Sequence, residues 1–391
     1  MALKLKSFSQ PDLLKTIHPR NLIPLLEPFR LFLEAKGFSF PESDEDVDVA
    51  ALGGILAQPD EEMPGDMVEM LHVIDCLGAD HRFDELLELA AANQIEVDGE
   101  ATALDLATII WLKNPEALER KQHEEFFQKR KTFESFIAAD PSTVIAIDDL
   151  ATDLSKLEAA LDIYFAAKKR GIGCRVMRAD SAGEVRFLVE HGQQCTRKQS
   201  RVGPRSTGTF YRPEKTDLVI YDVVHNELRI NASTFTDVKE YLVQFGRHVF
   251  GGDATFVFAE KYTLEPLKRD GRAAMNCRDI AGLDSVNLRE VEYWWPGTFE
   301  HVEIHRAEGL FHALAMIQRN IETEPQIRKA VFKFRLDGEK KPRSVTIKAG
   351  NKSGYNRGEE ASVIEDWLRA RGFVLTAEAQ NAKAESAMAG S

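Results

Sequence analysis

Apolar residues recur at helical spacing through the first third of the chain. The segment 20–37, RNLIPLLEPFRLFLEAKG, is amphipathic and ends at a glycine. The segment 100–113, EATALDLATIIWLK, repeats apolar residues three and four positions apart. Similar patterns continue to residue 135, and short connectors separate them. The pattern predicts a bundle of helices over residues 9–135.

The hydrophobic period changes near residues 138–149. One strong helix is expected over 152–171, and short runs typical of strands follow it: CRVMRA, EVRFLVE, GTFYR, DLVIYD and ELRIN. Farther along, apolar runs flank Pro296-Gly297 and Asp337-Gly338, which are residue pairs favoured in turns. Two further hairpins are therefore expected, with helices between and after them.

The predicted fold class is α+β and multidomain: an acidic all-helical N-terminal bundle followed by two mixed α/β units with antiparallel hairpins. We expect an acidic helical domain over 1–137, a central α+β domain over 138–263, and a C-terminal α+β domain with a basic hairpin over 264–375. The tail, 376–391, is rich in small residues and is expected to be disordered.

Charge is distributed unevenly along the chain. Residues 1–150 hold 13 Lys and Arg against 30 Asp and Glu, whereas residues 151–391 hold 37 against 33. Such asymmetry indicates contact between the basic part and a polyanion such as nucleic acid, and it leaves the acidic bundle as a surface for a protein partner. An ordinary solvated acidic surface is the alternative explanation.

Cysteine usage and hydropathy bear on the compartment. The four cysteines are far apart and form no Cys-x-x-Cys pair, which argues against a disulfide framework and against a cysteine-only zinc site. A reducing, cytoplasmic location is therefore expected. No apolar run approaches the ~18 residues that a membrane span needs, so no membrane partner is predicted.

Two basic segments are candidates for phosphate contact. Residues 195–215 are rich in Gly, Ser and Pro, which predicts a mobile loop. In the hairpin within 329–357, cations share the polar face or crowd the turn, and apolar residues lie behind them. A solvated basic face is the alternative. The candidate nucleic-acid contacts are Arg197, Lys198, Arg201, Arg205, Lys333, Arg335, Lys340, Lys341, Arg343 and Lys348.

The segment 216–231, TDLVIYDVVHNELRIN, predicts a hairpin with candidate chemistry. A turn of two or four residues over 223–226 places Asp222 opposite Glu227. Because alternate residues of a strand face opposite sides of the sheet, Asp222, Glu227 and Arg229 share one face.

This acid pair resembles the hairpin of metal-dependent nucleases of the PD-(D/E)XK kind, and the order of elements over about 153–258 resembles that family's core. The resemblance implies a Mg²⁺ or Mn²⁺ ion held by Asp222 and Glu227, with Arg229 in the place of the family's lysine. The alternative is a structural hairpin whose polar face is open to water. In that case a Glu227→Gln substitution would cost at most about 1 kcal/mol, as in an exposed ion pair.

The strand HVEIH, 301–305, offers a second candidate metal site. His301 and Glu303 lie two residues apart on one face, about 6.6 Å from each other, and could chelate an ion. A strand that shows its polar side to water is the alternative. Phosphate-binding loops, dinucleotide-binding glycine patterns and serine-hydrolase motifs are absent from the sequence.

The function predicted from these patterns is a non-catalytic, cytoplasmic, nucleic-acid-associated protein. The basic loop and hairpin contact phosphates, and the acidic helical domain binds a protein partner. No cofactor is expected. The alternatives are a divergent PD-(D/E)XK-like nuclease, which alone would need Mg²⁺ or Mn²⁺, and a pure protein-interaction or scaffold protein.

Overall fold

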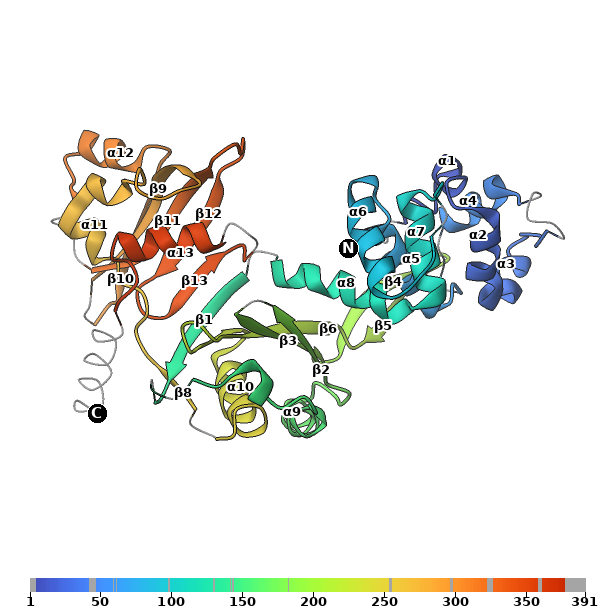
Figure 1. Ribbon diagram of the computed structural model, residues 1–391, viewed down its shortest axis with the longest axis horizontal. Coiled ribbons are helices and arrows are strands. Elements are labelled where there is room, and N and C mark those ends of the chain that lie inside the picture. The colour runs from blue at the N-terminus through green and yellow to red at the C-terminus, as the bar shows by residue number, and fades with distance from the viewer. Residues whose placement is uncertain are drawn as a thin grey trace. The chain divides into compact units, whose positions relative to one another are not determined.

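Figure 1 presents the protein as a computed structural model, which describes residues 5–376 except 42–46, 59, 61, 98, 129–130, 141, 143, 182, 253–254, 296–297, 322–325 and 358–360. The chain forms two compact units, residues 1–127 and 128–391. The first is helical, and the second contains all the described strands. The tail predicted to be disordered lies outside the described residues after Thr376.

The helical unit is built around its own apolar core. Leu71, Leu106 and Ile110 are completely buried there. One helix of this core begins after Thr102, whose hydroxyl accepts a hydrogen bond from the backbone N–H of Asp105 at 3.2 Å, as an N-cap does. The helices are α1 (Pro11–Leu14), α2 (Pro19–Leu26), η1 (Glu27–Phe29), α3 (Arg30–Ala35), α4 (Val49–Leu56), α5 (Gly65–Leu77), η3 (Asp80–Arg82), α6 (Phe83–Ala92), α7 (Ala103–Lys113) and α8 (Pro115–Gln128).

The second unit contains an antiparallel sheet of 11 strands in the order β10-β9-β11-β12-β13-β1-β7-β6-β3-β2, with β8 paired to β1. Its strands are β1 (Lys131–Ala138), β2 (Arg175–Ser181), β3 (Glu184–Gly192), β6 (Glu214–Asp222), β7 (Glu227–Asn231), β8 (Phe256–Phe258), β9 (Leu283–Trp295), β10 (His301–Arg306), β11 (Gln326–Leu336), β12 (Arg343–Lys348) and β13 (Lys352–Tyr355). Two more strands, β4 (Thr196–Val202) and β5 (Arg205–Tyr211), pair only with each other among the described residues.

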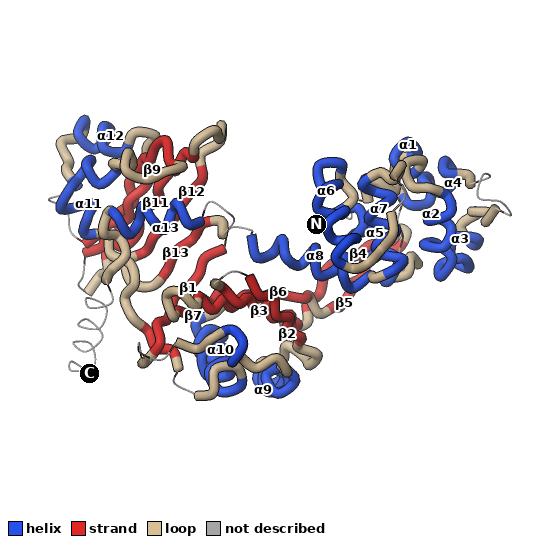
Figure 2. The backbone as a smooth tube through the Cα atoms, viewed as in Figure 1, coloured by secondary structure: helices blue, strands red, loops and turns tan. Residues whose placement is uncertain are grey.

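Helices cover opposite faces of the two halves of this sheet (Figures 1 and 2). On β1, Phe136 faces the core formed with α9 (Ser155–Ala167) and α10 (Phe235–His248). Phe133, an odd number of residues away, faces the side that carries the second core. The helices of that second core are α11 (Glu265–Asp270), η5 (Gly271–Met275), α12 (Leu310–Met316) and α13 (Ala361–Ala370); the short η4 (Ile147–Asp149) precedes α9.

Strand β1 joins strands that the sequence patterns assign to separate units. It pairs with β13 on one side and with β7 on the other, so one sheet runs through both regions. The helical prediction for 131–135 is wrong, because these residues belong to β1. Short-range periodicity indicates each local hairpin, but it carries no information about pairing between strands more than 200 residues apart, such as β1 and β13.

The prediction of a mobile loop over 195–215 is also wrong. Residues 196–211 form the β4–β5 hairpin, which turns at Gly203 and Pro204. Gly203 has φ 58, a conformation that glycine adopts without strain. The strands consist mainly of Thr, Ser, Gln and cations, so the apolar alternation that usually indicates a strand is missing.

Candidate nucleic-acid interface

The β4–β5 hairpin, called the ribbon below, has no core of its own. Its pairing runs without interruption from Thr196 opposite Tyr211 to Val202 opposite Arg205. None of its residues whose burial is described is buried, and Phe210 exposes 69% of its surface. A two-stranded hairpin without an apolar face is marginally stable alone. The ribbon is therefore presented to solvent rather than packed into the fold.

The base of the ribbon is held firmly to the sheet. The backbone N–H of Gln193 donates to the carbonyl of Pro213 at 2.7 Å. The guanidinium of Arg212 donates to the carbonyls of Lys169 and Gln193, both at 2.8 Å. Gly192 leaves no room for a side chain, because a Cβ atom would lie 2.4 Å from the carbonyl of Arg170. These contacts fix the point at which the ribbon leaves β3 and β6.

The ribbon carries positive charge, and no carboxylate of the described residues forms an ion pair with it. Arg197, Lys198, Arg201 and Arg205 are exposed, and in the described part of the chain none of them lies within 4.0 Å of a carboxylate. No Asp or Glu occurs between Glu190 and Glu214. Two of them lie near aromatic rings: Arg197 is 6.0 Å from the Phe210 ring and Lys198 is 5.3 Å from the Tyr211 ring. Arg201 donates to the carbonyl of Gly203 at 3.3 Å.

The predicted basic hairpin is β11–β12, and its two faces are as expected. Phe332 and Phe334 are completely buried against the core, whereas Arg335 and Lys348 are exposed and Lys333 is half-buried on the opposite face. We call this second side the open basic face of the sheet. Lys340 and Lys341 are exposed in the turn that follows β11.

Acids neutralise only part of the open basic face. Glu290 accepts from Lys329 at 2.7 Å and also pairs with Arg306. Arg343 pairs with Glu339 at 2.7 Å, which makes it less available to phosphate than the other predicted cations. Among the described residues, Lys333, Arg335 and Lys348 have no ion pair.

A groove of about 530 Å³ lies on this face over the paired strands β9 and β11. Arg289, Lys333 and Arg335 supply three cations to its lining, and Ser285 and Asn287 add hydrogen-bonding groups. Glu308 is the acid of the lining; it lies 3.5 Å from Arg289, but its side chain is 95% exposed. The residues Ser285, Asn287 and Arg289 were missed by sequence reasoning, because β9 shows no cluster of cations.

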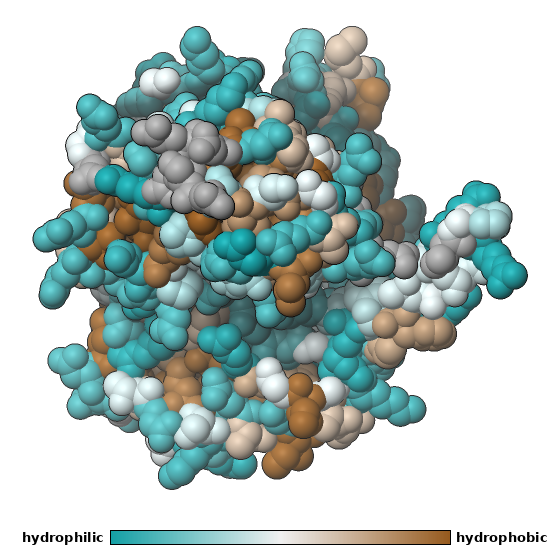
Figure 3. Space-filling model, turned by 90° about the vertical axis from the view of Figure 1, so that its right-hand side faces the viewer, coloured by the Kyte–Doolittle hydropathy of each residue, from teal (hydrophilic) through white to brown (hydrophobic). Residues whose placement is uncertain are grey.

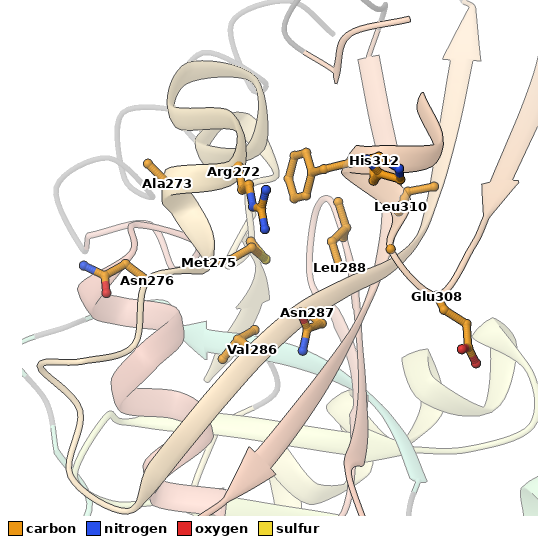
Figure 4. A pocket seen from close by; sticks show the side chains of 12 residues that line it. Arg272, Ala273, Met275, Asn276, Val286, Asn287, Leu288, Glu308, Leu310 and His312 are labelled. Carbon is orange, nitrogen blue, oxygen red and sulfur yellow. The ribbon is translucent and has the colours of Figure 1, made fainter. Parts of the chain in front are cut away.

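A neighbouring pocket of about 330 Å³ shares Asn287 and Glu308 with the groove. Arg272 and Met275 of η5 point into it together with Leu288 of β9, whereas Glu308 points away (Figure 4). Met275, Leu288 and Phe311 supply apolar side chains to part of its lining.

The predicted nuclease residues do come together, but as a buried charge cluster. Asp222 lies opposite Glu227 in the β6–β7 ladder. Arg229 donates to Glu227 at 3.0 Å and to Glu184 at 3.1 Å, and it also pairs with Asp222. Lys261 donates to both carboxylate oxygens of Glu227, at 2.7 and 2.6 Å.

The C-terminal helix extends this cluster. Glu365 of α13 accepts from Arg357 at 2.6 Å and from the Tyr355 hydroxyl at 2.8 Å, and its carboxylate lies 3.7 Å from Arg229. Burial alone would raise the pKa of Glu365, but Arg229, Lys261 and Arg357 hold it well below its usual range. Glu365 therefore stays ionised in the folded protein at neutral pH.

The expectation that this hairpin face is open to water is wrong. Glu227 and Lys261 are each 4% exposed and Arg229 is 2% exposed. Burial by itself would raise the pKa of Glu227, but Lys261 and Arg229 lower it to about 2. The limit of 1 kcal/mol for Glu227→Gln assumed an exposed pair and no longer applies.

The carboxylates of the cluster are engaged by cations rather than converging on open space. Both oxygens of Glu227 accept from Lys261, and Asp222 accepts from the backbone of His225 at 3.0 Å in addition to Arg229. Among the described residues, no group of three or more His, Cys, Asp or Glu side chains is placed to hold a metal ion. The arrangement favours a structural role for these charges.

The candidate metal residues on β10 have other partners as well. His301 stacks on Trp295, with ring centroids 4.9 Å apart. Glu303 accepts from Arg319 and lies 2.6 Å from His305. The two side chains predicted to chelate an ion thus take part in separate contacts.

Sequence reasoning missed the partners that bury the acid pair. Lys261, Arg357 and Glu365 lie between 30 and 140 positions along the chain from the hairpin, and nothing in their local pattern distinguishes them from surface charges. The sequence feature that could have indicated the contribution of Glu365 is the amphipathic segment 361–370, whose apolar side predicts a helix packed against a hydrophobic core.

Two further findings bear on function. Among the described residues, no helix combines the length and the apolar character that crossing a membrane requires. No known family model matches the chain, and no curated protein matches it in sequence. The function proposed below therefore rests on the residues of this chain alone.

Proposed function

We propose that this protein binds nucleic acid without catalysing a reaction, and that its phosphate contacts come from the ribbon and from the open basic face. The observation that carries the proposal is the ribbon itself: an exposed hairpin with four cations, no acid and no core. Phosphate groups supply the negative charge that such a surface lacks.

The open basic face supports the same function. Lys333, Arg335 and Lys348 point away from the core on a rigid sheet, and the groove beside them offers hydroxyl and amide groups. Protein–nucleic acid contacts combine cations with such neutral donors, because phosphate oxygens accept hydrogen bonds from both. The proposal assigns this face a second, more rigid contact with the polyanion.

The helical unit has a different part in the proposal. Its described acids leave it unsuited to phosphate, so we assign it to a protein partner. Figure 3 shows one face of the molecule, where hydrophilic side chains predominate and apolar side chains lie between them. An interface with a protein partner combines both kinds of group. A cytoplasmic location belongs to the same proposal and is supported by the four cysteines, all of which are free thiols.

Fluorescence anisotropy with a labelled 20-residue oligonucleotide tests the function. The variant Lys333→Glu/Arg335→Glu/Lys348→Glu should bind more weakly. The negative slope of log K against log salt should decrease in magnitude by about 3, roughly one per lost phosphate contact. The matched control is Lys156→Glu/Lys168→Glu/Lys239→Glu, which makes the same charge change on exposed positions of α9, of its C-cap and of α10. Equal affinities in both variants would remove the open basic face from the proposal.

A further inference from the structure

The register of the ribbon sorts its cations onto both of its sides. Residues that pair directly across the two strands point to the same side. Arg197 and Arg201 therefore lie on one side, together with Phe210. Lys198 and Arg205 lie on the other. The ribbon is positively charged on both faces rather than along one stripe.

Charge on both faces limits the shape of a matching partner. A polyanion that lies along a flat surface, or a single strand that follows a groove, presents phosphates to one face only. A ribbon with cations on both faces can satisfy all of them only between two phosphate backbones. The major groove of B-form DNA provides two such walls, and its width of about 12 Å admits a two-stranded ribbon.

The length of the ribbon suits the same groove. Each strand has 7 residues, so the ribbon is about 23 Å long at ~3.3 Å per residue. That length exceeds the groove depth of about 8.5 Å, so the tip can reach the base edges while the base of the ribbon stays at the sheet. The contacts of Arg212 and Gly192 hold that base in place, which reduces the ordering cost of binding.

Neutral side chains between the cations can add hydrogen bonds to the two phosphate walls. Gln199, Ser200, Thr207 and Thr209 occupy the middle of the ribbon, on the same two faces as the cations. Amide and hydroxyl groups of this kind donate hydrogen bonds to phosphate oxygens. Gly208 contributes by its lack of a side chain: a Cβ there would lie 2.4 Å from Nε of Arg197, so the glycine lets that guanidinium lie across the ribbon.

Other nucleic acids fit less well. Single-strand binding relies on aromatic side chains that stack on successive bases, and the ribbon offers one strongly exposed ring, Phe210. The major groove of an A-form RNA duplex is deep and too narrow for protein side chains to read. We infer that the ribbon enters the major groove of a B-form DNA duplex, with Arg197 and Arg201 toward one phosphate wall and Lys198 and Arg205 toward the other.

This inference rests on the proposed function, and three probes distinguish a failure of the inference from a failure of that function. They are a DNA duplex of 20 base pairs, one of its strands alone, and an RNA duplex of the same sequence. The full-length protein should bind the DNA duplex at least tenfold more tightly than either other probe at equal salt. Tighter or equal binding of the single strand or of RNA would overturn the inference and leave nucleic-acid binding intact. Failure to bind any probe would overturn both.

Two paired variants test whether both faces take part. The two variants are Arg197→Gln/Arg201→Gln and Lys198→Gln/Arg205→Gln. Each should reduce the magnitude of the slope of log K against log salt for duplex DNA by about 2. The control Lys156→Gln/Lys239→Gln removes the same charge from helices and should leave the slope unchanged. A loss confined to one of the two ribbon pairs would show that the ribbon lies on one phosphate backbone, and it would overturn insertion into the groove.

Discussion

At the scale of single residues, the charge cluster around Arg229 combines an unfavourable desolvation energy with favourable electrostatic attraction. Placing ions in an apolar interior is expensive, and mutual attraction offsets that cost only when every charge has a partner. Arg229, Glu227 and Lys261 meet this condition, because each forms hydrogen bonds or ion pairs at 3.1 Å or less within the cluster. The cluster is therefore sensitive to the loss of any one member.

Replacing Glu227 with Gln should destabilise the protein by about 3–5 kcal/mol, because Lys261 is left buried without its counter-ion. Urea unfolding at pH 7 measures this. The control is Glu339→Gln, which breaks the surface pair with Arg343 and should cost less than about 1 kcal/mol. Similar losses in the two variants would mean that the cluster is not buried as described.

The same carboxylate predicts how stability changes with acid. The folded pKa of Glu227 is about 2, against an ordinary value of 4.5. Its contribution to the free energy of unfolding, on the order of 3 kcal/mol, is therefore complete above pH 4.5 and is lost as the pH falls toward 2. Unfolding curves between pH 5 and pH 2.5 should show the wild type and Glu227→Gln converging. A constant difference across this range would contradict the assigned pKa.

The residues of this cluster show what a sequence can and cannot reveal. Strand parity is a local property, so the shared face of Asp222, Glu227 and Arg229 could be predicted. Burial depends on what packs over that face, and here Lys261 and Glu365 arrive from distant segments. The composition of the face alone, two acids and an arginine, indicated that the face is exposed to solvent.

At the scale of elements, the ribbon and the sheet strands that it connects differ in how much they contribute to a core. The strands β3 and β6 are fixed by buried residues such as Phe187 and Val219, whereas the ribbon that connects them buries nothing in its described residues. An element kept without contribution to a core is a candidate for contact with a partner. Because its sequence is polar, the ribbon was predicted to be a loop, although its positive charge could be counted from the residues.

Removing the ribbon should leave the fold intact. Joining Cys195 to Arg212 through Asn-Gly deletes 196–211 and retains the hydrogen bond between Gln193 and Pro213. We expect Tm to change by no more than about 2 °C, because changes at exposed sites alter stability by about 0.5 kcal/mol. Differential scanning calorimetry checks this. A loss of cooperative unfolding would show that the ribbon supports the sheet.

At the scale of the whole molecule, acidic and basic residues predominate in different parts of the chain. The excess of acids lies in residues 1–150, whereas the ribbon and the open basic face of the second unit each carry exposed cations that form no ion pair among the described residues. This division could be predicted from charge counts. The single sheet through β1 could not, because it depends on pairing between residues such as Phe133 and Ser353. Charge counts thus indicated where acidic and basic residues predominate, but not how the strands pair.

The salt dependence of binding to a 20-base-pair DNA duplex, compared between the wild type and the ribbon-deletion variant, tests the central claim most directly. The deletion removes Arg197, Lys198, Arg201 and Arg205, so the slope of log K against log salt should fall in magnitude by about 3.6, and affinity should fall with it. Calorimetry on the same sample shows whether the rest of the fold persists. A folded deletion variant that binds with the wild-type slope would contradict the assignment of the ribbon as the nucleic-acid contact.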